Sequence, residues 1–527
     1  MGALFNDIGA PRMGRSVFDL SYRKKMTCDM GQLIPIMHDE MVPGDVFKIK
    51  SEIMLRFQPL VAPIMHEVNV FRHYFFVPYR LLWDDWEEFI SGGTDGTVEL
   101  DPPTWEPTQN GIGSLWDYMG LPTGVDPDGA YPLDFIRRAY NMIYNEYYRD
   151  ENLVSEIALT NELILRRAWE KDYFTSALPW QQRGVAPAIP ISGSTLTEAV
   201  FAGLGNFVSG TASANGLTWP AVSTSGLSQF GYNSSNNAPV DAGTKASLER
   251  GTANAHTHTI TGSTMQTGLN GKNTVNVDFS DASTFNVADL RLAFQIQKWM
   301  ERNARSGVRY VEFLNAHFGV SPSDARLQRP EFIGGSRSPV VVSEVLQTSE
   351  TATTPQGNMG GHGISVDREF AGTYRAEEYG VLIGLMSVMP RTAYQQGINR
   401  QWLRRTRFDF YFPEFANLSE QAIERAELYA SNVAAENTTI FGYQGRYDEM
   451  RTKPDLVCGE MRDTLDYWHL GRQFSSAPLL NQNFIECNPD KRIFAVQNVP
   501  GLIVQVGNII RASRPMPIIS NPGLIDH

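Results

Sequence analysis

The carboxylates between residues 83 and 89 come closer to a catalytic arrangement than any other side chains in this sequence. Four acids are interleaved with three large rings, in the order Trp83, Asp84, Asp85, Trp86, Glu87, Glu88 and Phe89. Two carboxylates beside aromatic rings are what a glycosidase uses for acid–base chemistry on a sugar. On a short helix the same residues give a solvated acidic face opposite the tryptophans. We favour the solvated face. The alternative is a β-sandwich carbohydrate-active enzyme whose acid and base come from Asp85, Glu87 and Glu88.

Two further patterns contain residue types that bind ligands. His256 and His258 are two residues apart, so on a strand both imidazoles would point to the same side. They supply only two ligands, so a metal would require several copies around a symmetry axis. The glycine-rich run from Gly357 to Gly363 lacks the strand-to-helix context of a nucleotide-binding loop. We therefore expect two exposed loop histidines and a turn, with no metal and no cofactor.

Basic residues gather in three parts of the sequence, and each part has the charge to contact nucleic-acid phosphates. The N-terminal group is Arg12, Arg15, Arg23, Lys24 and Lys25, the central group is Arg302, Arg305, Arg309, Arg326, Arg329 and Arg337, and the third is Arg400, Arg404, Arg405 and Arg407. For most of them a solvated or intersubunit face is an equally good explanation, so charge alone does not identify a binding site.

The elements that must position these side chains are mostly strands. Residues 46–57 place apolar side chains on one parity and charged ones on the other, which predicts a half-buried strand. Residues 68–77 and 379–390 are apolar on both parities, which is typical of strands covered on both faces. Further strands are predicted at 340–346 and 407–412, with a C-terminal hairpin of 492–499 and 502–510.

Helices are predicted where apolar residues recur three and four apart. These segments are 81–90, 132–147, 286–305 and 310–318, and the Gly- and Pro-rich residues 91–131 are expected to form a loop. Strands scattered over the whole length, between long insertions, favour one elaborated β-sandwich over several small domains.

Residues 192–284 differ from the rest of the chain. Only eight of these 93 residues are charged, and 48 are Gly, Ser, Thr or Asn. Such a segment has little to bury and belongs on a surface. A stretch of this length inside a compact domain is usually functional or disordered.

Composition excludes several classes of protein. The 527 residues include 45 Lys and Arg against 58 Asp and Glu, a net charge of 45 − 58 = −13, whereas free-standing nucleic-acid binders are usually basic. The 28 Phe, 20 Tyr and 10 Trp exclude disorder of the whole chain. Three cysteines without a CxxC pair predict neither a disulfide framework nor a zinc ribbon, and fit a reducing cytoplasm. The first residues have no signal-peptide pattern, and the best apolar run is about half a membrane span.

Several long stretches resemble the major capsid proteins of small single-stranded DNA phages, the Microviridae, and in particular the gokushovirus branch. The centre of the resemblance is RLAFQIQKWMER (291–302), then Arg309 and Tyr310, HFGV (317–320) and DARLQRPE (324–331). RHYFFVPYR (72–80), LLWDDWEEF (81–89), PQGN (355–358) and DFYFPEF (409–415) agree as well. The polar insertion matches in position and composition but not in its residues.

This resemblance implies a mainly β fold, an eight-stranded antiparallel jelly roll with large helix- and loop-containing insertions. It also implies a structural protein of the virion, not an enzyme, that assembles with itself into a T=1 icosahedral shell. The shell would enclose circular single-stranded DNA and form in the host cytoplasm, with a scaffolding protein as a further partner. Residues 192–284 would form a protrusion at each three-fold axis, exposed to a host surface receptor.

We divide the chain accordingly into an interior N-terminal arm (1–45), a first jelly-roll part with inserted helices (46–191), the protrusion (192–284) and the remaining jelly roll with a helical insertion and a C-terminal tail (285–527). The arm has five basic residues, Arg12, Arg15, Arg23, Lys24 and Lys25, against Asp7 and Asp19, and we expect these five to contact DNA. Chains with a net charge of −13 would not neutralise packaged DNA unaided. A small basic DNA-binding virion protein is therefore expected as well.

Overall fold

The computed structural model describes residues 14–94, 96–187, 287–307, 309–346, 348, 357 and 359–519. The chain forms two compact units, one of Met1–Ala186 and Gln295–His527, the other of Pro187–Phe294. Every described strand belongs to the first unit, whereas the second contributes Pro187 and the start of helix α5 (Val287–Ser306). No helix of the described residues combines the length and the apolar character needed to cross a lipid bilayer.

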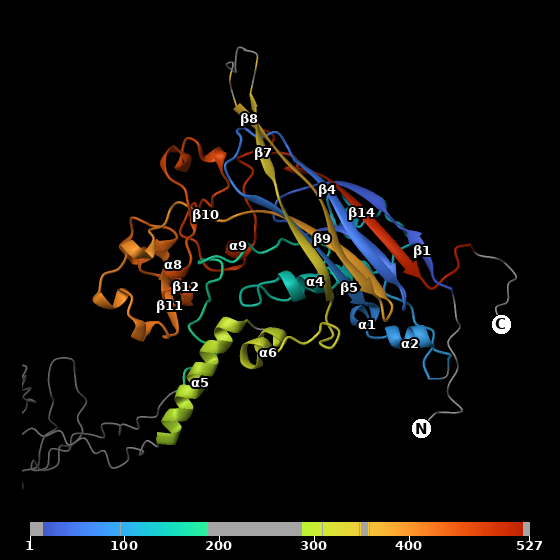
Figure 1. The fold of residues 1–527 in the computed structure, drawn as a ribbon, viewed down its shortest axis with the longest axis horizontal. Helices are drawn as coiled ribbons and strands as arrows, with labels where there is room; N and C mark the ends of the chain where they lie inside the picture. Colours follow the sequence, from blue (N-terminus) through green and yellow to red (C-terminus); the bar gives the residue numbers. More distant parts are fainter. Residues whose placement is uncertain are drawn as a thin grey trace, which may run out of the picture. The chain divides into compact units, whose positions relative to one another are not determined.

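The larger sheet is antiparallel and brings the two ends of the described chain together (Figure 1). Strands β1 (Ser16–Asp19) and β2 (Tyr22–Cys28) both pair with β14 (Leu502–Arg514), which pairs on its other side with β4 (Val46–Phe57). Next come β8 (Met359–Arg375) and, at the far edge, β7 (Val341–Leu346).

The smaller sheet is also antiparallel, in the order β3 (Ile34–Met41), β9 (Gly380–Pro390), β5 (Val68–Pro78) and β6 (Glu331–Pro339). Consecutive strands from β2 to β5 alternate between the two sheets. The predicted β-sandwich is thus confirmed. The count of eight jelly-roll strands stays a prediction, because the described strands of the two sheets number six and four.

The core lies between the sheets and follows from the alternation of side chains along each strand. On β4, Phe47, Ile49 and Leu55 are fully buried, and they belong to one apolar cluster with Met386 of β9 and Val504 of β14. Strand β9 is buried at every position because its second face is covered too.

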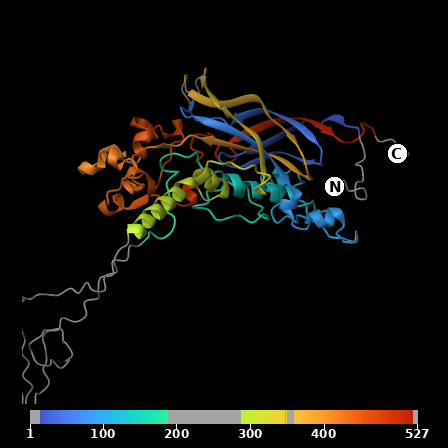
Figure 2. The same ribbon diagram turned by 60° about the horizontal axis from the view of Figure 1, so that its bottom comes forward.

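A layer of short helices covers that second face (Figure 2). Trp105, Trp116 and Tyr140 pack there in one cluster with Val381 and Ile383 of β9. The elements of this side are α1 (Tyr79–Leu82), α2 (Trp86–Ser91), α3 (Leu115–Tyr118), α4 (Phe135–Ile143), the π-helical turn η1 (Tyr144–Tyr148) and α6 (Tyr310–Phe318).

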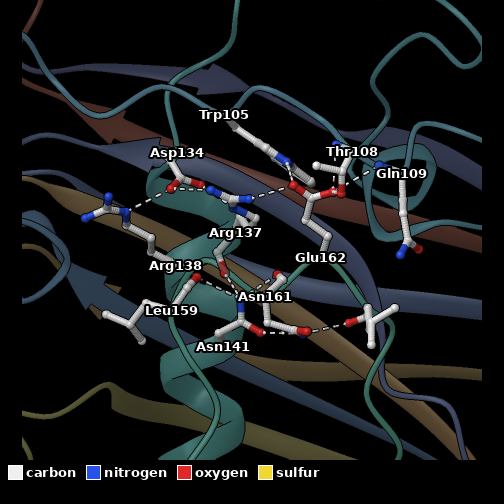
Figure 3. Close-up of polar contacts among 11 residues, drawn as sticks. Trp105, Thr108, Gln109, Asp134, Arg137, Arg138, Asn141, Leu159, Asn161 and Glu162 are labelled. Carbon is white, nitrogen blue, oxygen red and sulfur yellow. Dashed lines mark hydrogen bonds and ion pairs between the residues drawn. The ribbon is translucent and has the colours of Figure 1, made fainter.

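A polar network fixes the irregular chain of this layer (Figure 3). The guanidinium group of Arg137, on α4, is held between the carboxylates of Asp134 and Glu162. Glu162 also accepts hydrogen bonds from the indole of Trp105 and from the backbone of Thr108 and Gln109. One carboxylate therefore connects the loop around residue 108 to the helix beneath it.

Between β9 and β14 the chain forms a lobe of short elements around its own apolar cluster, which includes Phe174, Tyr394 and Phe441. Its strands are β10 (Ala393–Tyr394), β11 (Glu420–Glu424), β12 (Ile440–Gly445) and β13 (Asp455–Leu456), and its α-helices are α7 (Ala434–Asn437), α8 (Asp448–Arg451) and α9 (Gln482–Ile485). The 3₁₀ turns are η2 (Arg400–Trp402), η3 (Arg407–Asp409), η4 (Pro413–Phe415), η5 (Arg425–Glu427), η6 (Gly459–Arg462) and η7 (Asp466–Trp468).

Most predicted elements are confirmed. The strands at 46–57, 68–77, 340–346 and 379–390 and the helices at 286–305 and 310–318 agree with the observed bounds to within two residues. Residues 81–90 form two helices instead of one, because an extended Trp83 ends α1 and α2 starts afresh at Trp86.

Three segments differ from their predicted structure. Residues 407–412 are a 3₁₀ turn and its exit, not a strand, since no strand among the described residues pairs with their extended part. Residues 492–499 contain no strand, and 502–510 pair with β2 and β4 rather than in a hairpin. Residues 16–41, expected within an arm, supply strands β1, β2 and β3.

Candidate nucleic-acid interface

The outer face of the six-stranded sheet is uncovered. On β4, Lys48, Lys50, Met54 and Arg56 are exposed, because the residues between them point into the core. The register continues this face onto the neighbouring strands. Met54, for example, is opposite Gln505 of β14 and Val366 of β8. An entire sheet surface is therefore open to solvent on the side away from the helices.

This face is basic although the chain is acidic. Among the described residues its exposed cations are Arg23, Lys25, Lys48, Lys50, Arg56, Arg368, Arg375 and Arg511, and its acids are Asp19 and Glu52. The local balance is 8 − 2 = +6, against −13 for the whole chain. One pair is internally neutralised, since Arg368 and Glu52 are 2.9 Å apart.

Exposed apolar side chains stand between these cations. Lys50 is opposite Phe370 on β8 and Ile509 on β14, and the ring of Phe370 is 53 % exposed. Cations that follow a backbone, with aromatic faces between them, are the combination that binds single-stranded nucleic acid without reading its sequence. The arrangement can therefore hold phosphates and stack a base.

The five N-terminal residues predicted to contact DNA separate in the structure. Arg23 and Lys25 point outward from β2 onto the basic face. Arg15 instead donates to the carbonyl oxygens of Gly44 and Ser513. Arg12 lies outside the described residues.

Lys24 points inward, between its outward neighbours. Its ammonium group donates to the carbonyl oxygens of Pro35 and Tyr118. Burial lowers the pKa of Lys24 to about 8, which is the cost of removing this charge from water. Its ammonium group is therefore already bound within the chain, and the DNA-contact set proposed below omits it.

Most of the basic face was not predicted from the sequence. The outward direction of Lys48 and Lys50 could be predicted, because they alternate with apolar residues along a clear strand. No sequence pattern placed Arg368, Arg375 and Arg511 on this face, since β8 and β14 reach it only by pairing with β4, which is distant in the chain.

The acidic cluster on α2 is a solvated face, as favoured above. Asp84, Asp85, Glu87 and Glu88 are exposed, and none of them makes an ion pair within the described part of the chain. Trp86 packs instead on Tyr79, with ring centroids 4.8 Å apart, and on Phe135. The rings serve the helical layer, and the carboxylates face water.

The other two ligand patterns differ in how much of them the structure describes. His256 and His258 lie outside the described residues. The glycine-rich run enters β8 at Met359, so it continues as a strand rather than a turn, and a Cβ on Gly361 would meet the backbone of Pro63 at 2.6 Å. Within the described ranges, no group of three or more His, Cys, Asp or Glu side chains could hold a metal ion.

Most arginines of the other two basic groups are paired within the chain. Arg329 and Arg337 meet Asp324 and Glu67, while Arg400 meets Glu427. A cleft of about 860 Å³ beside the central group contains acids as well as bases, such as Glu151 and Arg309, which are themselves paired. These groups mainly stabilise the fold.

The structure shows a β-sandwich with one uncovered basic face, and the comparisons with known proteins assign it to a class of structural proteins. The model of the family described as Capsid protein (F protein) matches residues 7–524. The chain belongs to this family of phage capsid proteins, of the Microviridae, and it is not an enzyme. The carbohydrate-active alternative is thereby excluded.

Three relatives are similar over nearly their whole length, and each is named capsid protein VP1. That of Chlamydia phage 1 is 37 % identical over 582 residues, covering 99 % of this chain and 97 % of its own. That of Bdellovibrio phage phiMH2K is 34 % identical over 511 residues, covering 92 % and 90 %. That of Spiroplasma virus 4 is 31 % identical over 563 residues, covering 97 % and 95 %.

Proposed function

We propose that copies of this chain close into a T=1 icosahedral shell around circular single-stranded DNA, with the basic sheet face turned inward. The single observation that carries the inward orientation is the charge of that face, +6 on a chain of −13. A polyanion inside the shell is attracted to a face of this sign, while the remaining surface carries the compensating negative charge. The DNA-contact set is Arg23, Lys25, Lys48, Lys50 and Arg511.

The polar insertion is connected to the first unit at two points that lie close together. The chain leaves the first unit after Ala186 and re-enters it at Gln295. Just inside these points, the amides of Gln182 and Gln297 form a hydrogen bond, and α5 continues toward α6 on the helical side.

One further partner follows from the same charge balance, and two others are expected from the resemblance to capsid proteins. With a net charge of +6 on this face, each chain neutralises only a few phosphates of the DNA. A small basic virion protein neutralises the remaining phosphates. A scaffolding protein assists assembly in the host cytoplasm, and a host surface receptor binds the insertion.

The proposal is tested on particles from infected cells and on protein expressed alone. Gradient sedimentation with electron microscopy is expected to give closed shells a few hundred ångström across, which protect single-stranded DNA from nuclease. Shells whose protrusions vanish on deletion of 192–284 support the assignment of the insertion. Monomers under both conditions overturn the shell.

The inward face is tested by charge reversal. Lys48→Glu with Lys50→Glu is expected to lower the DNA retained per shell, and to reduce the salt dependence of single-strand binding, d log K/d log[salt], by about 1.4 for two lost contacts. Arg302→Glu with Arg326→Glu is the matched control, because it reverses the same number of charges at exposed arginines off this face, on α5 and between α6 and β6. Equal DNA retention in both variants would contradict the assignment.

A further inference from the structure

A second unusual surface lies in the lobe, at residues 399–418. Its side chains include five large aromatic residues that are all at least 41 % exposed: Trp402 (75 %), Phe408 (50 %), Phe410 (52 %), Tyr411 (52 %) and Phe412 (41 %). Leu418 adds a further 51 % exposed apolar side chain. Phe408 and Phe412 both contact the ring of Phe415, and exposed apolar side chains gathered in this way are typical of an interaction site. We call residues 399–418 the aromatic segment.

The aromatic segment is held in one conformation although it has little regular structure. Asp409 accepts hydrogen bonds from the backbone N–H groups of Arg405 and Thr406, at 2.9 and 2.7 Å. The hydroxyl of Tyr447 donates to the carbonyl oxygen of Phe410 at 3.1 Å. A surface that is already ordered loses little conformational entropy on binding.

The chemistry of the segment fits a protein partner better than a nucleic acid. It contains four arginines and no lysine, and aromatic residues with Arg, without Lys, are the usual composition of protein–protein contacts. Three of its four arginines make contacts within the lobe. Arg400 pairs with Glu427, and the guanidinium groups of Arg404 and Arg407 lie over the rings of Phe410 and Phe408.

The complementary surface is on the same molecule. Asp84, Asp85, Glu87 and Glu88 leave α2 strongly acidic, exposed and without ion pairs in the described ranges, beside Ile90, which is 50 % exposed. In Figures 1 and 2, α2 lies at one end of the first unit and the lobe at the other. Two complementary surfaces at opposite ends of one chain join copies head to tail, which can generate a ring.

We propose that the aromatic segment of one copy docks on the acidic helix α2 of the next copy. This inference rests on the proposed shell, since it names one of the contacts that close it. Trp402 and the Phe rings bury against the neighbour, while the cations of Arg405 and Arg407 face the carboxylates of α2. Arg405 is available for this, because its side chain is 63 % exposed and its nearest acid, Glu424, is 4.0 Å away.

Hydroxyl-radical footprinting tests the burial of Trp402 and Phe408 in DNA-filled particles, DNA-free shells and dissociated protomers. The expected result is oxidation of these two residues in the protomer and strong protection in both kinds of particle. Protection only in filled particles would assign the segment to DNA and overturn the proposal. Protection already in the protomer would mean that other residues of the same chain cover the aromatic segment. Oxidation in all three states would mean that the segment stays exposed in the particle. Either result overturns the docking.

A charge exchange tests the choice of α2. Arg405→Glu with Arg407→Glu, or Glu87→Lys with Glu88→Lys, is expected to reduce the yield of shells at least tenfold, and all four changes together should restore it. Circular dichroism and thermal unfolding confirm that each protomer is folded. Wild-type yields in both double variants, or no recovery in the quadruple variant, would overturn the pairing. A wild-type protein that forms no shells, either expressed alone or in infected cells, would instead contradict the proposed function, so the two failures are distinguishable.

Discussion

Arg72 of β5 reaches across the core and forms an ion pair with Asp367 of β8, which joins the two sheets of the sandwich. The guanidinium group is fully buried and also donates to Ser51 Oγ at 2.7 Å. The side chain of Asp367 is 31 % exposed, so the pair runs from the interior to the sheet surface.

Replacing Arg72 by Ala is expected to destabilise the protein by about 3–5 kcal/mol, because a carboxylate loses its buried partner and a large cavity remains. Arg72→Met with Asp367→Asn should cost less, since it removes the unpaired charge and retains most of the volume. Urea unfolding, followed by intrinsic fluorescence, measures both. Equal stability of the Ala variant and wild type would contradict a role of this pair in holding the sheets together.

The environment of His73 predicts an acid-sensitive sandwich. Burial, with a smaller contribution from Arg167, lowers the pKa of His73 to about 4. The folded state therefore favours the neutral imidazole, so its contribution to stability is complete above the unfolded pKa of about 6.5 and is lost as pH falls from there toward 4. The loss is on the order of 3 kcal/mol at about 1.4 kcal/mol for each unit.

Unfolding of His73→Gln across pH 4–7 checks this. The variant should show a shallower fall in stability than wild type, although not a flat one, because burial also lowers the pKa values of His38 and His66. Parallel pH profiles for variant and wild type would show that His73 does not contribute.

Gly361 on β8 is expected to tolerate no side chain. A Cβ there would lie 2.6 Å from Pro63 Cα and 2.8 Å from the carbonyl oxygen of Ala62, both backbone atoms that cannot move aside. Gly361→Ala should therefore lose about 1–3 kcal/mol through overpacking. Its neighbour provides the control, since the nearest atom to a Cβ on Gly360 is 3.6 Å away. Thermal unfolding that ranks the two variants equally would rule out this steric reason.

The carboxylate of Glu162 is expected to stabilise the helical layer through its charge. Burial opposes its ionisation, but the hydrogen bonds from Thr108, Trp105 and Gln109 outweigh this and lower the pKa of Glu162. Its stabilisation is therefore present above the ordinary Glu pKa and disappears as pH falls below it. Glu162→Gln should cost about 1.5–3 kcal/mol at neutral pH, as expected for charge-assisted hydrogen bonds, and progressively less in acid. A pH-independent difference in the free energy of unfolding would indicate a packing effect instead.

Sequence patterns predicted the parts of the fold that depend on local alternation. β4 was recognisable because one buried face requires an apolar residue at every second position, and β9 because two buried faces require apolar residues at nearly every position. β14 was given the wrong partner, because its neighbours β2 and β4 are more than 400 residues away and no local pattern encodes such pairing. The aromatic residues at 408, 410 and 412 imitate a strand, although no partner strand is present among the described residues.

The basic face could be predicted from the sequence only in part. Arg23 and Lys25 were recognised as charge, but their outward direction and the inward direction of Lys24 follow from register with β14. The cations contributed by β8 and β14 become part of one face only in three dimensions. The enzyme alternative was reasonable from the types of side chain present. Membership of the capsid protein family excludes it, and the rings of Trp83 and Trp86 pack on Phe135 of the helical layer.

The orientation of the sandwich in the particle is the most direct test of the central claim. Electron cryo-microscopy of DNA-filled particles from infected cells would place every sheet relative to the genome. We expect the face carrying Lys48, Lys50 and Arg511 on the inner surface, in contact with nucleic-acid density, and residues 192–284 on the outside. A shell with the helical layer inward and this basic face toward the solvent would contradict it.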